Sequence, residues 1–442
     1  MPLLVALTIE ARDGVTNGRA GRLHTAHGDV RTPAFVPLAT KATVKGLLPA
    51  EVKALGYDMV LGNTFHLMLN PGGELIERLG GLHGFMDWDG PIVTDSGGFQ
   101  VFSMGHGTVA DEIKSRSSRA GSWDAVGRGD AGGAEAGSAE GLAEAGRAGK
   151  HAKAGREGAA RDAAGREGAI LSIDERGVRF RSYVDGSERF LSPEGSMQVQ
   201  ASLGSDIALV FDECTPFHVD RGYTERSTER THRWLTRCLE WHTEHGPSGQ
   251  LVYGIVQGGV YEDMRRASAR TVASSGCDGV AIGGSLGAEK AQMYEVVGYA
   301  VAELDGEHER LPRHLLGIGE VDDLIRGVEL GIDTFDCAMP TRLGRHGTAL
   351  VPEPENRWRV DLTKSMWRTS EEPLMEGCAC HACARGLSRA YLSYLARSRE
   401  LTGMRLLTEH NLAFIARLMA DLRGAILCGQ LAEVAARLRA GR

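Results

Sequence analysis

Residues 207–211 read Ile-Ala-Leu-Val-Phe, and Asp212 follows them directly. An unbroken apolar run of this length is typical of a β-strand that is buried on both faces, as the strands of parallel sheets are. Similar runs recur along the chain, and each ends in glycine or a polar residue. They begin at Phe35, Met59, Ile92, Val252, Gly279, His314 and Ile332. The sequence therefore predicts eight strands of a parallel sheet.

Helical patterns lie between several of these runs, at about 195–203, 224–245, 261–275, 288–304 and 320–330. Strands that alternate with helices in this way are typical of a (β/α)8 TIM barrel. A doubly wound open sheet is the alternative, but no Gly-x-Gly-x-x-Gly motif follows the first strand. We expect N-terminal β elements over 1–30, a catalytic barrel over 31–355, and a zinc-binding subdomain with C-terminal helices over 356–442.

Composition limits the classes of partner. The chain has 442 residues, of which 42% are hydrophobic, and its formal net charge is −8. It can bury a large core, but it cannot bind nucleic acid through an overall basic surface, so any RNA site must be a local patch. We find no apolar run as long as a membrane span and no export signal, which predicts a cytoplasmic protein with reduced cysteines.

One segment differs from the rest of the chain. Residues 111–169 are rich in alanine and glycine, and the string Ala-Gly-Arg-Glu-Gly-Ala occurs twice, at 154–159 and 164–169. Such a segment has too few large apolar side chains to offset the entropy of ordering. We interpret it as a flexible insertion that interrupts the barrel.

Polar residues follow most of the predicted strands, at the end where a barrel carries its active site. They include Asp95, Asp212, Gln257, Gly284 and Asp336. A single Asp in this position is often a helix cap, and paired glycines often mark only a turn. Two carboxylates with separate roles would suit substitution at a sugar carbon. The remaining donors and acceptors suit a flat, hydrogen-bonding ring such as a nucleobase.

A cysteine cluster near the C-terminus predicts a metal site. Cys378, Cys380 and Cys383 are close in sequence, and His410 stands at what reads as a helix start. Three thiolates and one imidazole complete a closed tetrahedral zinc site, which is structural rather than catalytic. The alternative is a chance Cys-rich turn. Basic residues at 341–345 and several arginines after the cysteines favour contacts with a phosphate backbone.

At these residues the sequence resembles the bacterial-type tRNA-guanine transglycosylases, also called queuine tRNA-ribosyltransferases. The resemblance rests on the strings at 94–101, 211–216, 254–258 and 335–342, together with the Cys-x-Cys-x2-Cys…His set. It implies that guanine at the wobble position (position 34) of tRNAs with GUN anticodons is exchanged for 7-aminomethyl-7-deazaguanine (preQ1), the queuosine precursor. The exchange would be a double displacement through a covalent Asp–ribose intermediate, in an enzyme that acts as a homodimer.

The resemblance also implies residue roles. Asp336 would be the nucleophile and Asp95 the general acid/base. The base would be bound by Asp95, Ser96, Gly97, Gly98, Phe99, Asp212, Gln257 and Gly284. The tRNA would be held by Gly317, Ile318, Gly319, Glu320, Val321, Asp322, Asp323, Thr341, Arg342, Leu343, Gly344 and Arg345. Zinc would be bound, one ion per chain, by Cys378, Cys380, Cys383 and His410.

The sequence departs from the family pattern at two places. One is the insertion at 111–169. The other is Ser285-Leu286-Gly287, where bacterial members usually have Leu-Ala-Val or Leu-Ser-Val. Gly287 is expected to enlarge the base pocket, which keeps queuine open as the incoming base beside preQ1. Two further hypotheses are a non-catalytic tRNA-binding partner subunit, and a relative that modifies a tRNA core guanine or DNA.

Overall fold

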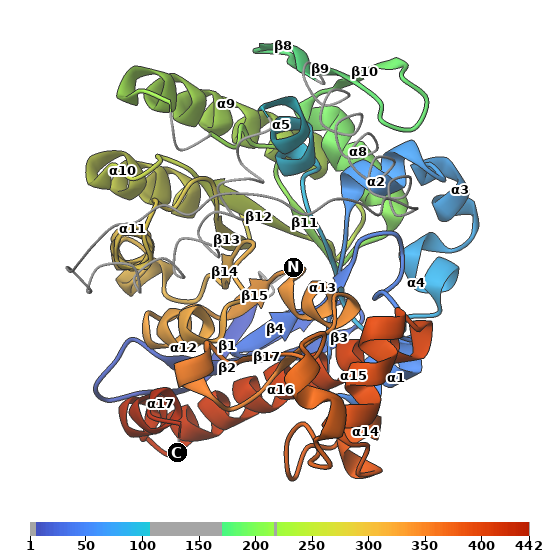
Figure 1. Cartoon of the computed structure of the whole chain (residues 1–442). Helices are drawn as coiled ribbons and strands as arrows, with labels where there is room; N and C mark the ends of the chain where they lie inside the picture. The colour runs from blue at the N-terminus through green and yellow to red at the C-terminus, as the bar shows by residue number, and fades with distance from the viewer. Residues whose placement is uncertain (1–5, 107–169, 216–218, 442) are drawn as a thin grey trace, which may run out of the picture.

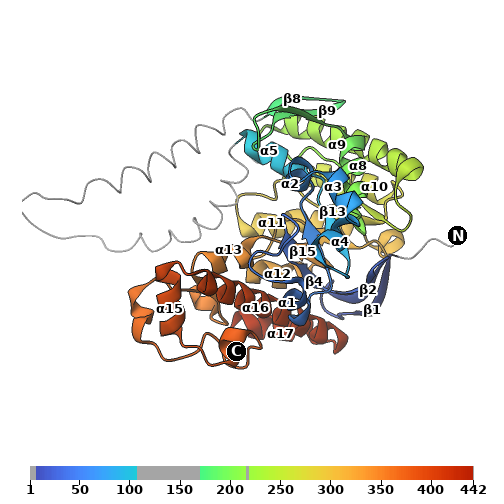
Figure 2. The same ribbon diagram turned by 90° about the vertical axis from the view of Figure 1, so that its right-hand side faces the viewer.

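The computed structural model describes residues 6–106, 170–215 and 219–441 (Figures 1 and 2). The predicted insertion at 111–169 lies outside these residues.

The central sheet has the strand order β4-β15-β14-β13-β12-β11-β7-β6-β5, and all its pairings are parallel. The strands are β4 Ala34–Val36, β5 Leu38–Ala39, β6 Val60–Gly62, β7 Ile92–Thr94, β11 Ile207–Leu209, β12 Leu251–Val256, β13 Gly279–Ile282, β14 Arg313–Leu315 and β15 Thr334–Asp336. Only Pro37, which has no N–H to donate, separates β4 from β5. These two segments are one interrupted strand that pairs with β15 and with β6, so it closes the sheet. The predicted (β/α)8 TIM barrel is confirmed.

Helices surround the sheet, and α9 to α12 follow one another around its outer side (Figure 1). The helices of the barrel region are α1 Pro49–Ala54, α2 Thr64–Leu69, α3 Gly73–Arg78, α4 Gly81–Met86, α5 Gly98–His106, α8 Pro193–Leu203, α9 Arg221–His245, α10 Glu262–Ala273, α11 Lys290–Ala302, α12 Val321–Glu329 and α13 Met339–Arg345. Local sequence sets the start of α8, because the Ser192 side chain accepts a hydrogen bond from the Gly195 N–H and Pro193 occupies the first turn.

In the described part of the chain, three smaller antiparallel sheets accompany the barrel. They are formed by β1 Leu7–Arg12, β2 Arg19–Thr25 and β3 Gly28–Thr32; by β8 Ile170–Asp174, β9 Gly177–Arg181 and β10 Glu188–Leu191; and by β16 Thr348–Leu350 with β17 Arg359–Asp361. The C-terminal helices are α14 His381–Ala384, α15 Arg389–Ser398, α16 Leu401–Leu427 and α17 Leu431–Arg439. Among the described residues, no helix is both long enough and apolar enough to cross a membrane.

The position of His410 differs from the prediction. We expected a helix start at this residue, but α16 begins at Leu401 and His410 lies well inside it. Gly403, which weakens a helix by itself, sits where a side-chain carbon would come within 2.7 Å of Leu395. The close packing of α15 against α16 therefore requires a small residue at position 403, and the helix continues through this glycine.

Helix α16 also connects the two ends of the chain. Arg423, near the end of this helix, donates a hydrogen bond to the main-chain oxygen of Gly21 at 3.0 Å and forms an ion pair with Glu10. Helix α16 therefore reaches from the cysteine cluster to the N-terminal sheet, which places it across one side of the barrel (Figure 2).

Candidate functional site

The polar residues predicted at the strand ends lie at one mouth of the barrel. Asp95 follows β7, Gln257 follows β12, Gly284 comes after β13, and Asp336 is the last residue of β15. Asp212 comes three residues after β11. Because the strands are parallel, their carboxyl ends meet at the same edge, so these five residues lie together at one end of the barrel.

Asp95 is held in one orientation by several donors. The carboxylate accepts hydrogen bonds from the main-chain N–H groups of Thr64 at 2.9 Å and Gly97 at 3.2 Å, and from the side chains of Asn63 and Gln100. Burial, together with the nearby negative charge of Asp336, nevertheless raises the pKa of Asp95 to about 7. A carboxyl group with this pKa can both donate and accept a proton near neutral pH.

Asp212, Gln257 and Gly284 form a compact group beside Asp95. The Gln257 side-chain N–H donates to Asp212 at 2.6 Å, and the Ser96 hydroxyl donates to the other carboxylate oxygen at 3.1 Å. Burial raises the pKa of Asp212 to about 6. The Gln257 Oε1 atom is buried and has no hydrogen-bond partner among the described residues. Gly284 has φ +76°, and a Cβ there would lie 2.1 Å from Oε1, so only glycine fits.

Ser96, Gly97, Gly98 and Phe99 complete this side of the mouth. The Gly98 N–H donates to the Ser96 hydroxyl, and a Cβ at Gly98 would come within 2.8 Å of the Asp212 main-chain oxygen. Phe99, at the start of α5, keeps 36% of its surface exposed. An exposed aromatic ring beside a group of hydrogen-bonding side chains is suited to stacking on a planar ligand.

Asp336 is 8% exposed, and both donors that contact its carboxylate bind the same oxygen. Its Oδ1 accepts hydrogen bonds from the Gly317 N–H at 3.0 Å and from His314 Nε2 at 3.2 Å. Among the described residues, no donor contacts Oδ2. Asp336 therefore presents one free carboxylate oxygen at the mouth.

A buried arginine that the sequence analysis missed fixes two of the loops. Arg265 on α10 is fully buried and donates to the main-chain oxygens of Val256, Gly259, Gly283 and Ser285 at 2.7–3.0 Å. These carbonyls flank Gln257 and Gly284, so Arg265 holds both residues at a fixed separation. The sequence shows Arg265 only as one charge on a helix, and nothing local marks it as buried.

The predicted RNA-binding residues occupy two different settings. Residues 341–345 lie on α13, where Arg342 and Arg345 face outward to different degrees. Residues 317–323 lead into α12, and their acidic side chains are engaged by the protein itself: Glu320 with Arg359, Asp322 with Trp358, and Asp323 with Lys290 and Tyr294. Any RNA contact by 317–323 would therefore fall mainly to the main chain.

Two lysines extend the basic group of α13. Lys41 and Lys45 lie between β5 and α1, at the same mouth, and neither pairs with a carboxylate among the described residues. Burial lowers the pKa of Lys45, and the positive charges of Arg345 and Lys41 contribute to the same shift. We call Lys41, Lys45, Arg342 and Arg345 the mouth cluster. The arginines after the cysteines are different, since Arg389 binds main-chain oxygens and Arg405 pairs with Glu51.

The expected role of Gly287 is wrong. This residue has φ +102°, and a Cβ there would lie 2.5 Å from the side chain of Gln292 on α11, so it points at that helix. Glycine is required by the turn into α11, and it does not open the base pocket.

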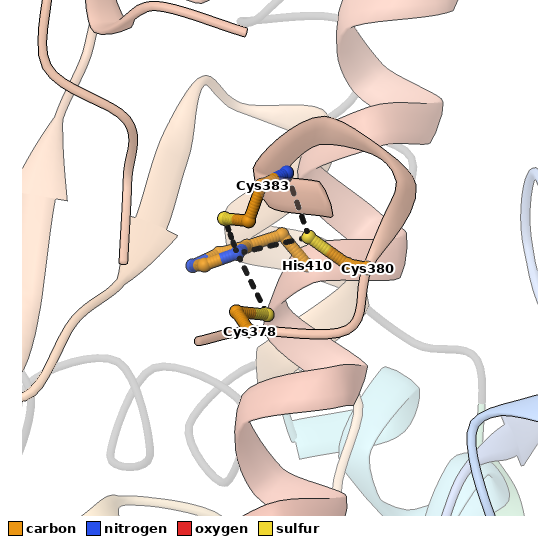
Figure 3. Close-up of side chains that lie close together, drawn as sticks. All are labelled: Cys378, Cys380, Cys383 and His410. Atoms are coloured by element: carbon orange, nitrogen blue, oxygen red, sulfur yellow. Dashed lines mark hydrogen bonds between the residues drawn. The ribbon is translucent and has the colours of Figure 1, made fainter. Parts of the chain in front are cut away.

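The cysteine cluster has the geometry of a tetrahedral metal site (Figure 3). The Nδ1 atom of His410 lies 3.8, 3.4 and 3.4 Å from the sulfur atoms of Cys378, Cys380 and Cys383. Zinc bonds of about 2.3 Å to sulfur and 2.0 Å to nitrogen separate tetrahedral ligand atoms by about 3.5 Å. His410 Nε2 donates to the Leu350 main-chain oxygen at 2.7 Å, which leaves Nδ1 free to bind a metal.

A second histidine group does not share this geometry. The rings of His27 and His83 stack with centroids 3.7 Å apart, and both contact Asp206. A metal ion lies in the plane of each imidazole that binds it, and stacked rings offer no such shared position. Asp206 also accepts from the Ile92 N–H at the start of β7, so this group joins elements at the opposite end of the barrel.

Comparisons with known proteins show which family the chain resembles. The family described as "Queuine tRNA-ribosyltransferase" matches residues 13–125 and 149–442. The unmatched residues are 1–12 and 126–148, and the second range lies within the predicted insertion. The queuine tRNA-ribosyltransferase of Roseiflexus sp. (strain RS-1) is 44% identical over 443 residues, covering 98% of this chain and 99% of the relative. The one from Pelotomaculum thermopropionicum is 41% identical over 432 residues, covering 98% and 97%. The one from Psychrobacter cryohalolentis is 40% identical over 415 residues, covering 93% and 91%.

Proposed function

Because the chain belongs to the queuine tRNA-ribosyltransferase family, and is therefore a pentosyltransferase with tRNA-guanine transglycosylase activity, we propose that it inserts preQ1 at the wobble position of tRNAs with GUN anticodons. The reaction proceeds by double displacement. Oxygen of Asp336 bonds to the ribose C1′ as guanine leaves, and the incoming base then displaces Asp336.

The observation that carries this proposal is the contrast between two carboxyl groups at one mouth. Asp336 has a free oxygen for attack, while the pKa of Asp95 is raised to about 7 by burial. Asp95 can therefore protonate the departing guanine and accept the proton of the incoming base. Each displacement inverts the configuration at C1′, so two displacements in succession retain it.

Base recognition falls to the group around Asp212. In its ionised form Asp212 accepts hydrogen bonds from the N–H groups of the base, and the unpartnered Gln257 Oε1 offers a further acceptor. Phe99 stacks on the ring. The base must leave the RNA stack to reach this depth, which the open mouth of a barrel allows.

The tRNA backbone and the metal complete the proposal. The mouth cluster binds phosphates around the wobble base, together with residues 317–323 and 341–345. Cys378, Cys380, Cys383 and His410 hold one structural zinc ion, whose chemistry is to stabilise the C-terminal subdomain. The enzyme acts in the cytoplasm as a homodimer.

Release of labelled guanine tests the proposal. Purified protein is incubated with tRNA that carries radiolabelled guanine at position 34, with preQ1, with queuine, or with no added base. Stoichiometric release with preQ1 is the expected result, and a tRNA with adenine at this position is the control. If guanine is released with queuine but not with preQ1, queuine is the incoming base instead of preQ1. Binding of tRNA without release under any condition would indicate a non-catalytic partner subunit.

The affinity for preQ1 is expected to depend on the protonation of Asp212. Its pKa in the empty site is raised to about 6 by burial, and only the carboxylate accepts two N–H groups. Affinity should therefore be constant above this pH and fall about tenfold for each pH unit below it. Isothermal titration calorimetry from pH 4.5 to 8 measures this. Asp212→Asn should bind preQ1 more weakly and should lose the tenfold fall below about pH 6, whereas a change near pH 7, where Asp95 titrates, should remain. An unchanged pH profile in that variant would assign the titration to another group.

Reversing one charge of the mouth cluster is expected to weaken tRNA binding selectively. Lys45→Glu should raise the Kd for tRNA about tenfold and reduce the salt dependence of binding, because a phosphate contact and its released counterion are lost. The KM for preQ1 should not change. Arg270→Glu, on the exposed side of α10, is the matched control and should leave tRNA affinity near the wild-type value. Equal losses in the two variants would indicate a general charge effect.

A further inference from the structure

His314 lies next to the proposed nucleophile and has no role in the reaction as described so far. It is 2% exposed, in the middle of β14, and its Nε2 atom is 3.2 Å from Asp336 Oδ1. Its Nδ1 atom is 2.9 Å from the hydroxyl of Thr334. A carboxylate can only accept hydrogen bonds, so Nε2 carries the proton, and in the neutral ring the Thr334 hydroxyl donates to Nδ1.

The register of the barrel produces this contact. His314 is the direct parallel partner of Thr334 on β15. Side chains two residues apart on a strand point to the same face, so Thr334 and Asp336 share a face of β15. The imidazole can therefore contact the hydroxyl with one nitrogen and the carboxylate with the other, and the chain Thr334–His314–Asp336 is fixed by buried backbone.

Both donors to Asp336 bind the same oxygen. The Gly317 N–H and His314 Nε2 contact Oδ1, while Oδ2 has no donor among the described residues. The side chain of Asp336 keeps 11% of its surface exposed, whereas that of His314 keeps 3%. Only one of the two oxygens is thus free to meet a substrate.

We propose that Asp336 attacks the ribose through Oδ2, and that His314 is a positioning residue that holds Oδ1 throughout the reaction. This inference rests on the proposed function, because it requires Asp336 to be the nucleophile. It deepens that function by assigning the reacting oxygen and a second residue to the nucleophile.

The two displacements use this arrangement differently. In the first, Oδ2 bonds to C1′, the bond from C1′ to guanine breaks, its electron pair leaves with guanine, and guanine takes a proton from Asp95. In the second, the incoming base gives its ring N–H proton to Asp95 and bonds to C1′, and the bond from Oδ2 to C1′ returns its electron pair to Asp336. Negative charge then develops across the departing carboxylate, where the donors to Oδ1 stabilise it.

A loss of His314 should therefore affect the second displacement more than the first. In the first step, the hydrogen bond from His314 orients the carboxylate but also makes it a weaker nucleophile, so these two effects on the rate oppose each other. In the second step, the same hydrogen bond orients the carboxylate and makes it a better leaving group, so both effects raise the rate. His314→Leu should slow release of tRNA from the covalent adduct by about 10- to 100-fold, which corresponds to the loss of one hydrogen bond to a charged group. Adduct formation should change much less.

Single-turnover kinetics test this with four proteins. The denaturation-resistant protein–tRNA adduct is followed on gels, first without an incoming base and then after addition of preQ1, for wild type, His314→Leu, His314→Gln and Thr334→Val. The glutamine amide retains a donor near the Nε2 position, so His314→Gln should recover most of the lost rate. Thr334→Val, which is nearly isosteric, should show an intermediate loss, and it also serves if the leucine variant fails to fold. The KM for tRNA should stay at the wild-type value in all of them.

The results distinguish a failure of the role proposed for His314 from a failure of the proposed base exchange. Slow adduct breakdown in His314→Leu with recovery in His314→Gln would support it. Wild-type rates for both steps in His314→Leu, or equal slowing of both steps in the leucine and glutamine variants, would overturn it. Asp336→Asn is run in parallel: if that variant still forms the adduct, the proposed function fails, and if it does not, only the role of His314 is at stake.

Discussion

Asp336→Asn is expected to abolish base exchange while tRNA binding persists. The asparagine amide has nearly the shape of the carboxylate, and its oxygen can still accept hydrogen bonds from Gly317 and His314. It is, however, a far poorer nucleophile, so exchange should fall by about four orders of magnitude or more. The covalent protein–tRNA adduct, resolved on a denaturing gel, should form with wild type and be absent from the variant.

The control for this substitution is Asp89→Asn, which removes a carboxylate that is 82% exposed and has no role in the proposed reaction. It should exchange guanine at the wild-type rate. Because the variant Asp336→Asn should retain its Kd for tRNA, loss of adduct together with loss of binding would point to misfolding. Full turnover by the variant would reject Asp336 as the nucleophile and with it the double displacement.

Loss of the metal site is expected to destabilise the C-terminal subdomain and to weaken tRNA binding. Cys380 is fully buried in the cluster, and Cys380→Ala removes one of four ligands. A structural zinc ion contributes on the order of 10 kcal/mol to the folded state of small domains, so a large fall in the melting temperature should follow. The effect should reach the proposed tRNA site because His410 donates to Leu350 and the adjacent Asn411 donates to Pro340, at the start of α13.

Three measurements distinguish this from a general loss of folding. Metal analysis should find about one zinc ion per wild-type chain and much less in the variant. The Kd for tRNA should rise about tenfold or more, while the Kd for preQ1, whose site is built from barrel loops, should stay within about threefold. Cys428→Ala changes an exposed cysteine outside the cluster and should match wild type in all three. Unchanged stability and zinc content in Cys380→Ala would contradict the metal site.

The sequence was informative wherever one short segment carries the whole signal. The apolar runs predicted the barrel strands because strands buried on both faces leave an unbroken hydrophobic pattern. The carboxylates were found because parallel strands bring their ends to one edge, so position in sequence implies position in space. The metal site was predicted because the spacing of the three cysteines alone places their thiols close together.

Residues whose role depends on distant partners were missed. His314 reads as part of an apolar run, and its contact with Asp336 exists only because β14 and β15 pair in one register. Arg265 reads as one of several arginines on a helix, yet it binds carbonyls in two loops. The prediction for Gly287 failed for a related reason: a glycine in the sequence does not reveal in which direction a side chain would have pointed.

The closure of the barrel sets a condition on when the chain can fold. Strand β4 is complete once residue 36 has been made, but its partner β15 ends at residue 336. The N-terminal sheet is completed later still, because its hydrogen bond at the Gly21 main-chain oxygen comes from Arg423. A ribosome that has translated the first half of the message therefore carries a sheet with an open edge, and such edges invite pairing with other chains. The barrel therefore cannot close until residue 336 has been made, and β4 keeps an unpaired edge until then.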